Sequence, residues 1–140
     1  MQRALYAALV VVAAISAVIG ISTLRKTNEL IPWQTDFKTA QAEAHRTGKP
    51  ILLDFSADWC GPCQEMRRTT WSDANVANAL HDYIPMQANV DANPELAAQF
   101  QVRTIPHLVV VNSRGAILKF TEGEMGPIQF LHWLGRASAN

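Results

Sequence analysis

The sequence predicts an α/β domain built around a central mixed β-sheet with helices on both faces. Short apolar runs bounded by Gly, Pro or Asn alternate with segments of helical periodicity. The predicted order is α-β-α-β-α-β-β-α, in which the last two strands are close enough in sequence to form a hairpin. The chain has 140 residues, which is enough for one such domain and little else.

The first half of the domain begins with a helix expected from near Asp36 to Thr47. Thr35 or Asp36 can cap its free N–H groups, and Gly48 can end it in the left-handed conformation. The apolar run that follows at residues 51–55 is typical of a strand that is buried on both faces, as in a parallel sheet.

Two helical segments are expected next, over residues 61–70 and from Ser72 or Asp73 to about residue 81. Pro62 fits the first turn of the earlier segment, because the N–H that proline lacks would have no helical partner there. Ser72 or Asp73 can cap the later segment with its side-chain oxygen.

The second half of the domain is expected to hold a strand, a short helix, a hairpin and a closing helix. Asn93 as the cap and Pro94 at the first position start the short helix. Asn112 to Gly115 form the turn of the hairpin. The expected elements are residues 83–90, 95–100, 107–111 paired with 116–120, and 127–136.

An uncharged run precedes this domain at residues 5–24, which are mostly Ala, Val, Ile and Leu. Twenty helical residues span roughly 30 Å, the thickness of a bilayer's hydrocarbon core. The run is longer than the roughly 7–15 apolar residues of a cleaved signal peptide. We therefore expect a transmembrane helix, with a cleaved signal or a buried helix as alternatives. The predicted organisation is an anchor at 1–26, a neck at 27–35 and a folded domain at 36–140.

The basic residues around this run leave its orientation open, since Arg3 precedes it and Arg25 and Lys26 follow it. Because short N-terminal tails commonly stay in the cytoplasm, we expect a single-pass inner-membrane protein with its domain on the periplasmic side. Those three residues leave 9 basic against 12 acidic residues from position 27 onward, a net charge of −3. No long basic run is present, so nucleic acid is not an expected partner.

Two cysteines, Cys60 and Cys63, stand in a C-x-x-C pattern where a strand leads into a helix. At a helix N-terminus the free N–H groups and the helix dipole lower the pKa of a thiol, so Cys60 is the expected nucleophile. Cys63 lies one turn further on, close enough to bridge Cys60. We expect it to be the more buried thiol and to act second.

The expected reaction is thiol–disulfide exchange, in which Cys60 forms a mixed disulfide and Cys63 resolves it, leaving an oxidised Cys60–Cys63 pair. Cys63 must lose its proton for the second step. Asp54 lies in an otherwise apolar strand, and the alternation of side chains lets it point toward the helix that carries Cys63. Burial would raise its pKa and suit it to accept that proton, although such an Asp can also merely cap the following loop.

These residues lie in a longer stretch, Leu53 to Cys63, that resembles the active-site segment of thioredoxins. Thr104-Ile105-Pro106 resembles the cis-proline loop of that family. The resemblance covers about residues 36–136 and implies the thioredoxin fold, with a cis peptide bond before Pro106. One departure is Gln87, which stands where thioredoxins have a buried lysine near the Asp, and its neutral side chain should raise the pKa of Asp54 further.

The resemblance also implies a binding surface for an extended substrate segment. The backbone of Ile105, held by Pro106, would lie beside the cysteine pair and bind the substrate backbone. Gly123 resembles the glycine that lets the substrate approach on the far side of the groove. The active-site flank would be formed by Trp59, Gly61 and Pro62.

Four segments resemble more closely the C-terminal periplasmic domain of DsbD-type thiol reductases. They are Ala57–Cys60, Thr70–Asp73, Val76–Leu80 and Gln87–Val90. This resemblance implies a domain that reduces protein disulfides outside the cytoplasm and receives its electrons from a thiol carrier or a thioredoxin. A disulfide oxidant or isomerase is one alternative. Another is a metal-handling protein whose cysteines and His107 bind copper or zinc, whereas thiol–disulfide exchange needs neither a metal nor a cofactor.

Overall fold

The computed structural model describes residues 30–135. The anchor expected at residues 1–26 and its apolar run at 5–24 lie outside these residues, and so do residues 27–29 of the predicted neck. Among the helices that are described, none is long and apolar enough to cross a membrane.

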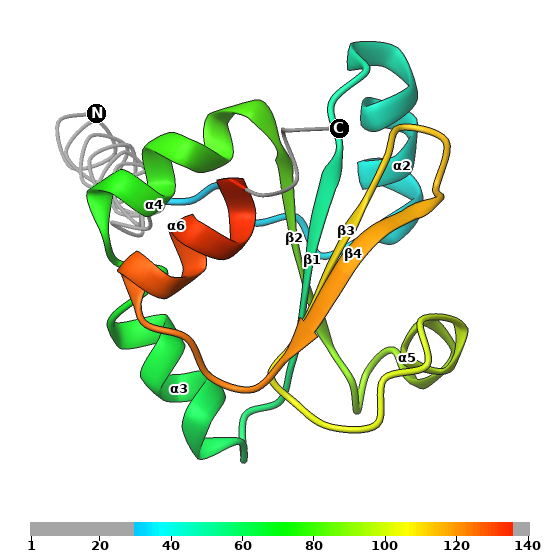
Figure 1. The fold of residues 1–140 in the computed structure, drawn as a ribbon. Coiled ribbons are helices and arrows are strands. Elements are labelled where there is room, and N and C mark those ends of the chain that lie inside the picture. Colours follow the sequence, from blue (N-terminus) through cyan, green and yellow to red (C-terminus); the bar gives the residue numbers. More distant parts are fainter. Residues whose placement is uncertain (1–29, 136–140) are drawn as a thin grey trace, which may run out of the picture.

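The described elements follow the predicted order (Figure 1). In chain order they are α2 (Phe37–Thr47), β1 (Ile51–Ser56), α3 (Gly61–Arg68), α4 (Ala74–Ala79), the 3-10 helix η1 (Leu80–Asp82), β2 (Ile84–Asn89), α5 (Pro94–Gln99), β3 (His107–Val111), β4 (Ile117–Glu122) and α6 (Pro127–Gly135). The single helical segment predicted up to residue 81 is thus divided into α4 and η1. Strand β4 continues past Phe120 because Glu122 pairs with His107.

The four strands form one mixed sheet in the order β2-β1-β3-β4. Strand β1 pairs with β2 in parallel and with β3 antiparallel, and β3 pairs with β4 antiparallel. Helices α2 and α5 lie on one side of the sheet, and α3, α4 and α6 lie on the other (Figure 1). The predicted mixed sheet with helices on both faces is confirmed.

Local side-chain chemistry explains where two of the helices start. Asp36 Oδ2 accepts a hydrogen bond of 2.8 Å from the Thr39 N–H at the start of α2. Asp73 Oδ1 accepts bonds from two N–H groups at the start of α4. Asn93 occupies the cap position of α5, but its side chain donates instead to the Asn89 carbonyl, 3.0 Å away. Asn93 therefore occupies the predicted cap position, but its side chain does not make the expected hydrogen bond to an N–H group of α5.

Strand β1 is buried along its whole length, as predicted, and its side chains alternate between two cores. Leu53 and Phe55 pack in the cluster on the α2 and α5 side. Leu52 packs in the cluster on the α3, α4 and α6 side. Because strand side chains alternate, Asp54 is directed to the same side as Leu52, toward α3.

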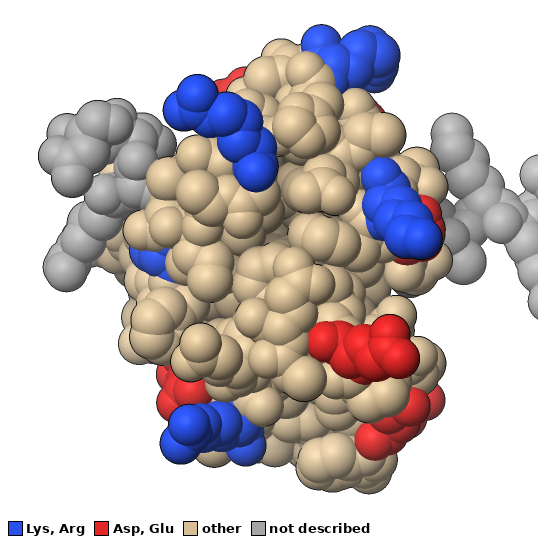
Figure 2. Space-filling model, turned by 90° about the vertical axis from the view of Figure 1, so that its right-hand side faces the viewer, with Lys and Arg blue, Asp and Glu red and all other residues tan. Residues whose placement is uncertain are grey.

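The molecular face that carries α5 and β4 is mainly uncharged at its centre. Figure 2 shows Lys and Arg side chains scattered around the margin of this face rather than gathered in one patch. The exposed apolar side chains of β4 include Ile117 and Phe120, which are 52% and 61% exposed.

Candidate active site at the start of α3

The two cysteines form a disulfide at the N-terminus of α3. The S–S bond is 2.04 Å long and the Cα atoms are 5.3 Å apart. Cys60 is the cap residue of the helix, and its Sγ accepts a hydrogen bond of 3.2 Å from the Cys63 N–H. A free helical N–H group therefore points at the Cys60 sulfur, which is the arrangement that stabilises a thiolate after reduction.

The two cysteines are equally buried, with 4% of each residue exposed. The expectation that Cys63 is the more buried residue is therefore wrong for this oxidised state. The physical reason is that Cys60 is covered as well: both cysteines pack with Ala57, and Val90 and Ile105 lie against this cluster.

The cis-proline loop lies directly beside the disulfide. The peptide bond between Ile105 and Pro106 is cis, and the Ile105 carbonyl oxygen is 3.8 Å from Cys60 Sγ. Gly123 adjoins this loop, because its N–H donates a 2.9 Å hydrogen bond to the Pro106 carbonyl. Gly123 has φ +89°, and a Cβ at this position would meet no atom within 4 Å. The glycine is thus required by the backbone conformation and faces open space.

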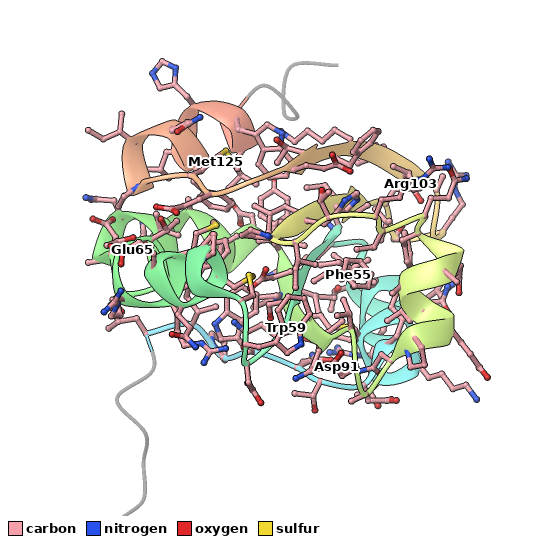
Figure 3. The ribbon with its side chains drawn as sticks, turned by 90° about the horizontal axis from the view of Figure 1, so that it is seen from below. Phe55, Trp59, Glu65, Asp91, Arg103 and Met125 are labelled. Atoms are coloured by element: carbon pink, nitrogen blue, oxygen red, sulfur yellow. A yellow bond between two sulfur atoms is a disulfide. The ribbon has the colours of Figure 1, made fainter. Side chains whose placement is uncertain are left out.

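A largely apolar groove adjoins the disulfide on the side of Trp59. Its volume is about 350 Å³, and it is lined by Trp59, Val90, Ala97, Val102, Arg103, Thr104 and Ile105. The Trp59 indole is 70% exposed, and Figure 3 shows it next to Asp91. Gly61 and Pro62 are exposed at the start of α3. The predicted flank residues and the cis-proline loop therefore lie around the buried cysteine pair, and the flank residues are exposed there.

Asp54 is buried, with 2% of the residue exposed. Burial raises the pKa of its carboxyl to about 6. Hydrogen bonds from Gln87 and Trp71 and the positive charge of Arg67 act in the opposite direction. Both hydrogen bonds reach Oδ2, over 3.2 Å from Gln87 Nε2 and 3.1 Å from Trp71 Nε1. A carboxyl with this pKa can exchange its proton near neutral pH.

Trp71 is the partner of Asp54 that the sequence did not identify. The pattern indicates only a core residue for Trp71, and it is indeed 5% exposed. Its contact with Asp54 depends on how the chain turns after α3, which local sequence does not specify. Hydrogen-bonding chemistry could have pointed to this contact. A buried Asp needs hydrogen-bond donors, and an indole N–H is one of the few donors that a core can supply.

His107 is buried at the start of β3 but faces Glu122 rather than the cysteines. Its Nδ1 lies 3.3 Å from Glu122 Oε1, at an angle that is poor for a hydrogen bond. Burial lowers the pKa of the imidazole, and the Glu122 carboxylate opposes this effect. Within residues 30–135, no three side chains of His, Cys, Asp or Glu come together in a way that could hold a metal ion.

Comparison with known families gives one matching model, described as Thioredoxin-like, over residues 32–113. The curated relatives include thiol:disulfide interchange proteins DsbD. The one from Salmonella typhimurium is 43% identical over 79 residues, which is 54% of this chain and 14% of the relative. The one from Escherichia coli K12 is 38% identical over 79 residues, with the same shares. The chain therefore spans a small part of these relatives' length.

Solved structures resemble the domain over most of its length. A thioredoxin from Thermus thermophilus is 25% identical, with a TM-score of 0.69 over 78% of this chain and 88% of that chain. A structure described as a DsbH oxidoreductase is 22% identical, with a TM-score of 0.67 over 81% of this chain and 91% of that chain. The domain has the thioredoxin fold.

Proposed function

We propose that this chain, which belongs to the thioredoxin-like family, is a thiol:disulfide oxidoreductase that reduces protein disulfides outside the cytoplasm while tethered to a membrane. One observation carries the proposal: the Cys60–Cys63 disulfide caps α3 and lies beside the cis-proline loop. A helix N-terminus favours the Cys60 thiolate, and the adjacent groove offers space for a substrate segment.

The proposed reaction starts from the dithiol. The Cys60 thiolate attacks one sulfur of a substrate disulfide, so that a mixed disulfide forms and the other substrate sulfur leaves as a thiolate. Cys63 gives its proton to Asp54 and attacks Cys60 Sγ, which releases the second substrate thiol and forms the Cys60–Cys63 disulfide. Two electrons pass from the protein to the substrate.

The exposed edge of the site suits an extended polypeptide as the substrate. The Ile105 carbonyl lies at the disulfide, and the groove between Trp59 and Ile105 can take an apolar side chain next to the substrate cysteine. Gly123, whose Cβ position is open, leaves room for backbone on the other side. Protein disulfides are therefore the substrate class.

Two features of the sequence support the direction of the reaction and the location of the domain. The Gly61-Pro62 pair and Ile105 before the proline resemble reducing thioredoxins, whose potentials lie near −270 mV, rather than strong oxidants near −120 mV. The apolar run at residues 5–24 is long enough to hold the domain at a membrane. A reductant on the outer side needs electrons from a membrane thiol carrier or a thioredoxin.

Reduction of insulin by the reduced protein tests the chemistry. We expect Cys60→Ser to be inactive and Cys63→Ser to accumulate a mixed disulfide with the substrate, because that variant can attack but cannot resolve. Activity of Cys60→Ser equal to that of the wild type would contradict the assignment of the nucleophile.

Thiol trapping in intact cells with a membrane-impermeant alkylating reagent tests direction and location together. We expect the pair to be accessible from outside and mostly reduced. A pair that is fully oxidised at steady state would contradict the role as a reductant, and a pair that reacts only after cell lysis would contradict the location.

A further inference from the structure

We infer that Trp71 and Gln87 are positioning residues for the proton transfer from Cys63, because together they hold one oxygen of the Asp54 carboxylate. This inference rests on the proposed role of Asp54 as the proton acceptor. It adds the two side chains that keep the carboxylate in its anionic form and in one orientation.

Both donors reach the same atom from different parts of the fold. Trp71 follows the end of α3, whereas Gln87 lies on β2 in register with Asp54 on β1. Their nitrogens are 3.1 and 3.2 Å from Asp54 Oδ2. Since Asp54 is almost fully shielded from solvent, these two bonds replace hydration of that oxygen. Hydrogen bonds to an anion are stronger than those to the neutral acid, so the pair favours the carboxylate.

The Trp71 ring is fixed by aromatic packing. It makes edge-to-face contacts with Trp33, at a centroid distance of 5.1 Å, and with Phe130, at 4.9 Å. The direction of the indole N–H is therefore determined by the core of the domain. A phenylalanine at this position would keep the packing but would lack the donor.

A cavity of about 350 Å³ lies beside the two donors. Trp71, Gln87, Arg67 and Trp33 line it, whereas Asp54 does not. The indole and the amide therefore stand between the carboxylate and this cavity. The Arg67 guanidinium on the cavity wall adds a positive charge that also favours the anionic form of Asp54.

This arrangement determines the pH range of the resolving step. Below the pKa of Asp54 the carboxyl already carries a proton and cannot accept another from Cys63. Each donor lowers the pKa of Asp54, so the resolving step stays fast down to a lower pH. Loss of one donor should raise the pH at which the resolving step becomes fast. The rate at high pH should not change, because Cys63 then ionises without transferring its proton to Asp54.

The pH profile of the resolving step in Trp71→Phe tests the inference. Reduced protein is mixed with dithiobis(nitrobenzoate): attack by Cys60 releases one thionitrobenzoate, and attack by Cys63 on the mixed disulfide releases the second. We expect the midpoint of the second release to rise by about one pH unit, which slows that release about fivefold near pH 6 and leaves it unchanged near pH 9. The first release should not change.

Trp133→Phe is the matched control, because it makes the same ring change in the same core cluster, where the Trp133 ring packs on Phe130. Its midpoint should equal that of the wild type, and an equal shift in this control would overturn the inference by assigning the effect to looser packing. Gln87→Met, which keeps the length of the side chain, should shift the midpoint in the same direction as Trp71→Phe and supplies the test if Trp71→Phe does not fold.

Asp54→Asn separates the inference from the proposed function. If this variant loses the pH dependence while Trp71→Phe and Gln87→Met keep the wild-type midpoint, the positioning role is wrong and the role of Asp54 stands. If Asp54→Asn itself keeps the wild-type profile, Asp54 is not the proton acceptor, and both the role of Asp54 and the positioning role of Trp71 and Gln87 are wrong.

Discussion

Trp59 and Asp91 lie 32 positions apart in the sequence but are joined by a hydrogen bond of 2.8 Å, from the indole Nε1 to Oδ2. The indole is largely exposed, so burial does not fix its orientation. The bond to Asp91 instead holds the ring at the wall of the groove beside the disulfide.

A double-mutant cycle with Trp59→Phe and Asp91→Ala measures this bond. We expect a coupling free energy of unfolding of about 0.5–1 kcal/mol, since the bond is exposed to water. We also expect the KM for a disulfide peptide to rise by a similar factor in both single variants, with little further loss in the double variant. Fully additive effects on KM would show that Asp91 does not orient the indole.

Gly123 is held at positive φ next to the cis-proline loop, which gives a second prediction. Gly123→Ala should lower the free energy of unfolding by about 1 kcal/mol, because an L-residue is strained in this conformation. The added methyl group should also raise the KM for peptide substrates. The matched control is Gly126→Ala, since Gly126 lies on the same loop, has no positive φ and also has open space at its Cβ. Equal effects of the two variants would contradict the prediction.

The buried Asp54 predicts a pH dependence of stability. Its folded pKa of about 6 lies above the ordinary value of 3.8, so the folded state holds this proton more tightly than the unfolded state. Wild-type stability from this group therefore falls as the pH rises from about 4 to 6, and the loss is complete above the folded pKa. The rise of the pKa from 3.8 to about 6 corresponds to roughly 3 kcal/mol in the free energy of unfolding.

Urea unfolding of oxidised wild type and oxidised Asp54→Asn checks this dependence. The Asn side chain keeps an oxygen for Trp71 and Gln87 but cannot ionise. We expect the variant to be the more stable protein near pH 7, by up to roughly 3 kcal/mol, and the difference to shrink toward pH 4. A difference that is constant over this range would mean that Asp54 does not titrate as described.

The positive charge of Arg67 gives a prediction that depends on salt. Arg67→Met should raise the pH midpoint of the resolving step, because the guanidinium favours the Asp54 carboxylate. Arg67 is exposed, so the shift should shrink between low and roughly 1 M salt, unlike the shift in Trp71→Phe. Arg68→Met is the control, since Arg68 instead pairs with Glu65 on the surface of α3. If the pH midpoint of Arg67→Met shifts by the same amount at low and high salt, the shift does not come from the charge of Arg67.

The order of the elements was predictable from sequence because local signals mark each one. The apolar run of β1 and the left-handed Gly48 both act within a few residues, and the structure agrees with them. The boundaries were less predictable. Strand β4 extends to Glu122 because it gains a partner, His107, from another strand. Pairing of this kind is decided by tertiary contacts.

The residues of the candidate site also differ in whether local sequence signals or tertiary contacts determine them. Cys60, Cys63 and Asp54 could be proposed from type and spacing, since a thiol pair at a helix start and an acid in an apolar strand are both local features. The cis-proline loop could be expected only through the resemblance to thioredoxins. The cap bond of Asn93 could not be predicted, because its side chain can bond either to the first N–H groups of the helix or to a nearby carbonyl, and the folded backbone decides between them.

What the sequence by itself determined is the chemistry: two thiols three residues apart, at the junction of a buried strand and a helix that starts with proline. What only the tertiary structure decided is how that chemistry is tuned. The indole of Trp71 and the amide of Gln87 meet at one oxygen of Asp54 because the connection after α3 and the register of β1 with β2 bring them together. The free energy of a buried charge depends on the atoms packed around it, and those atoms come from segments that are distant in the sequence.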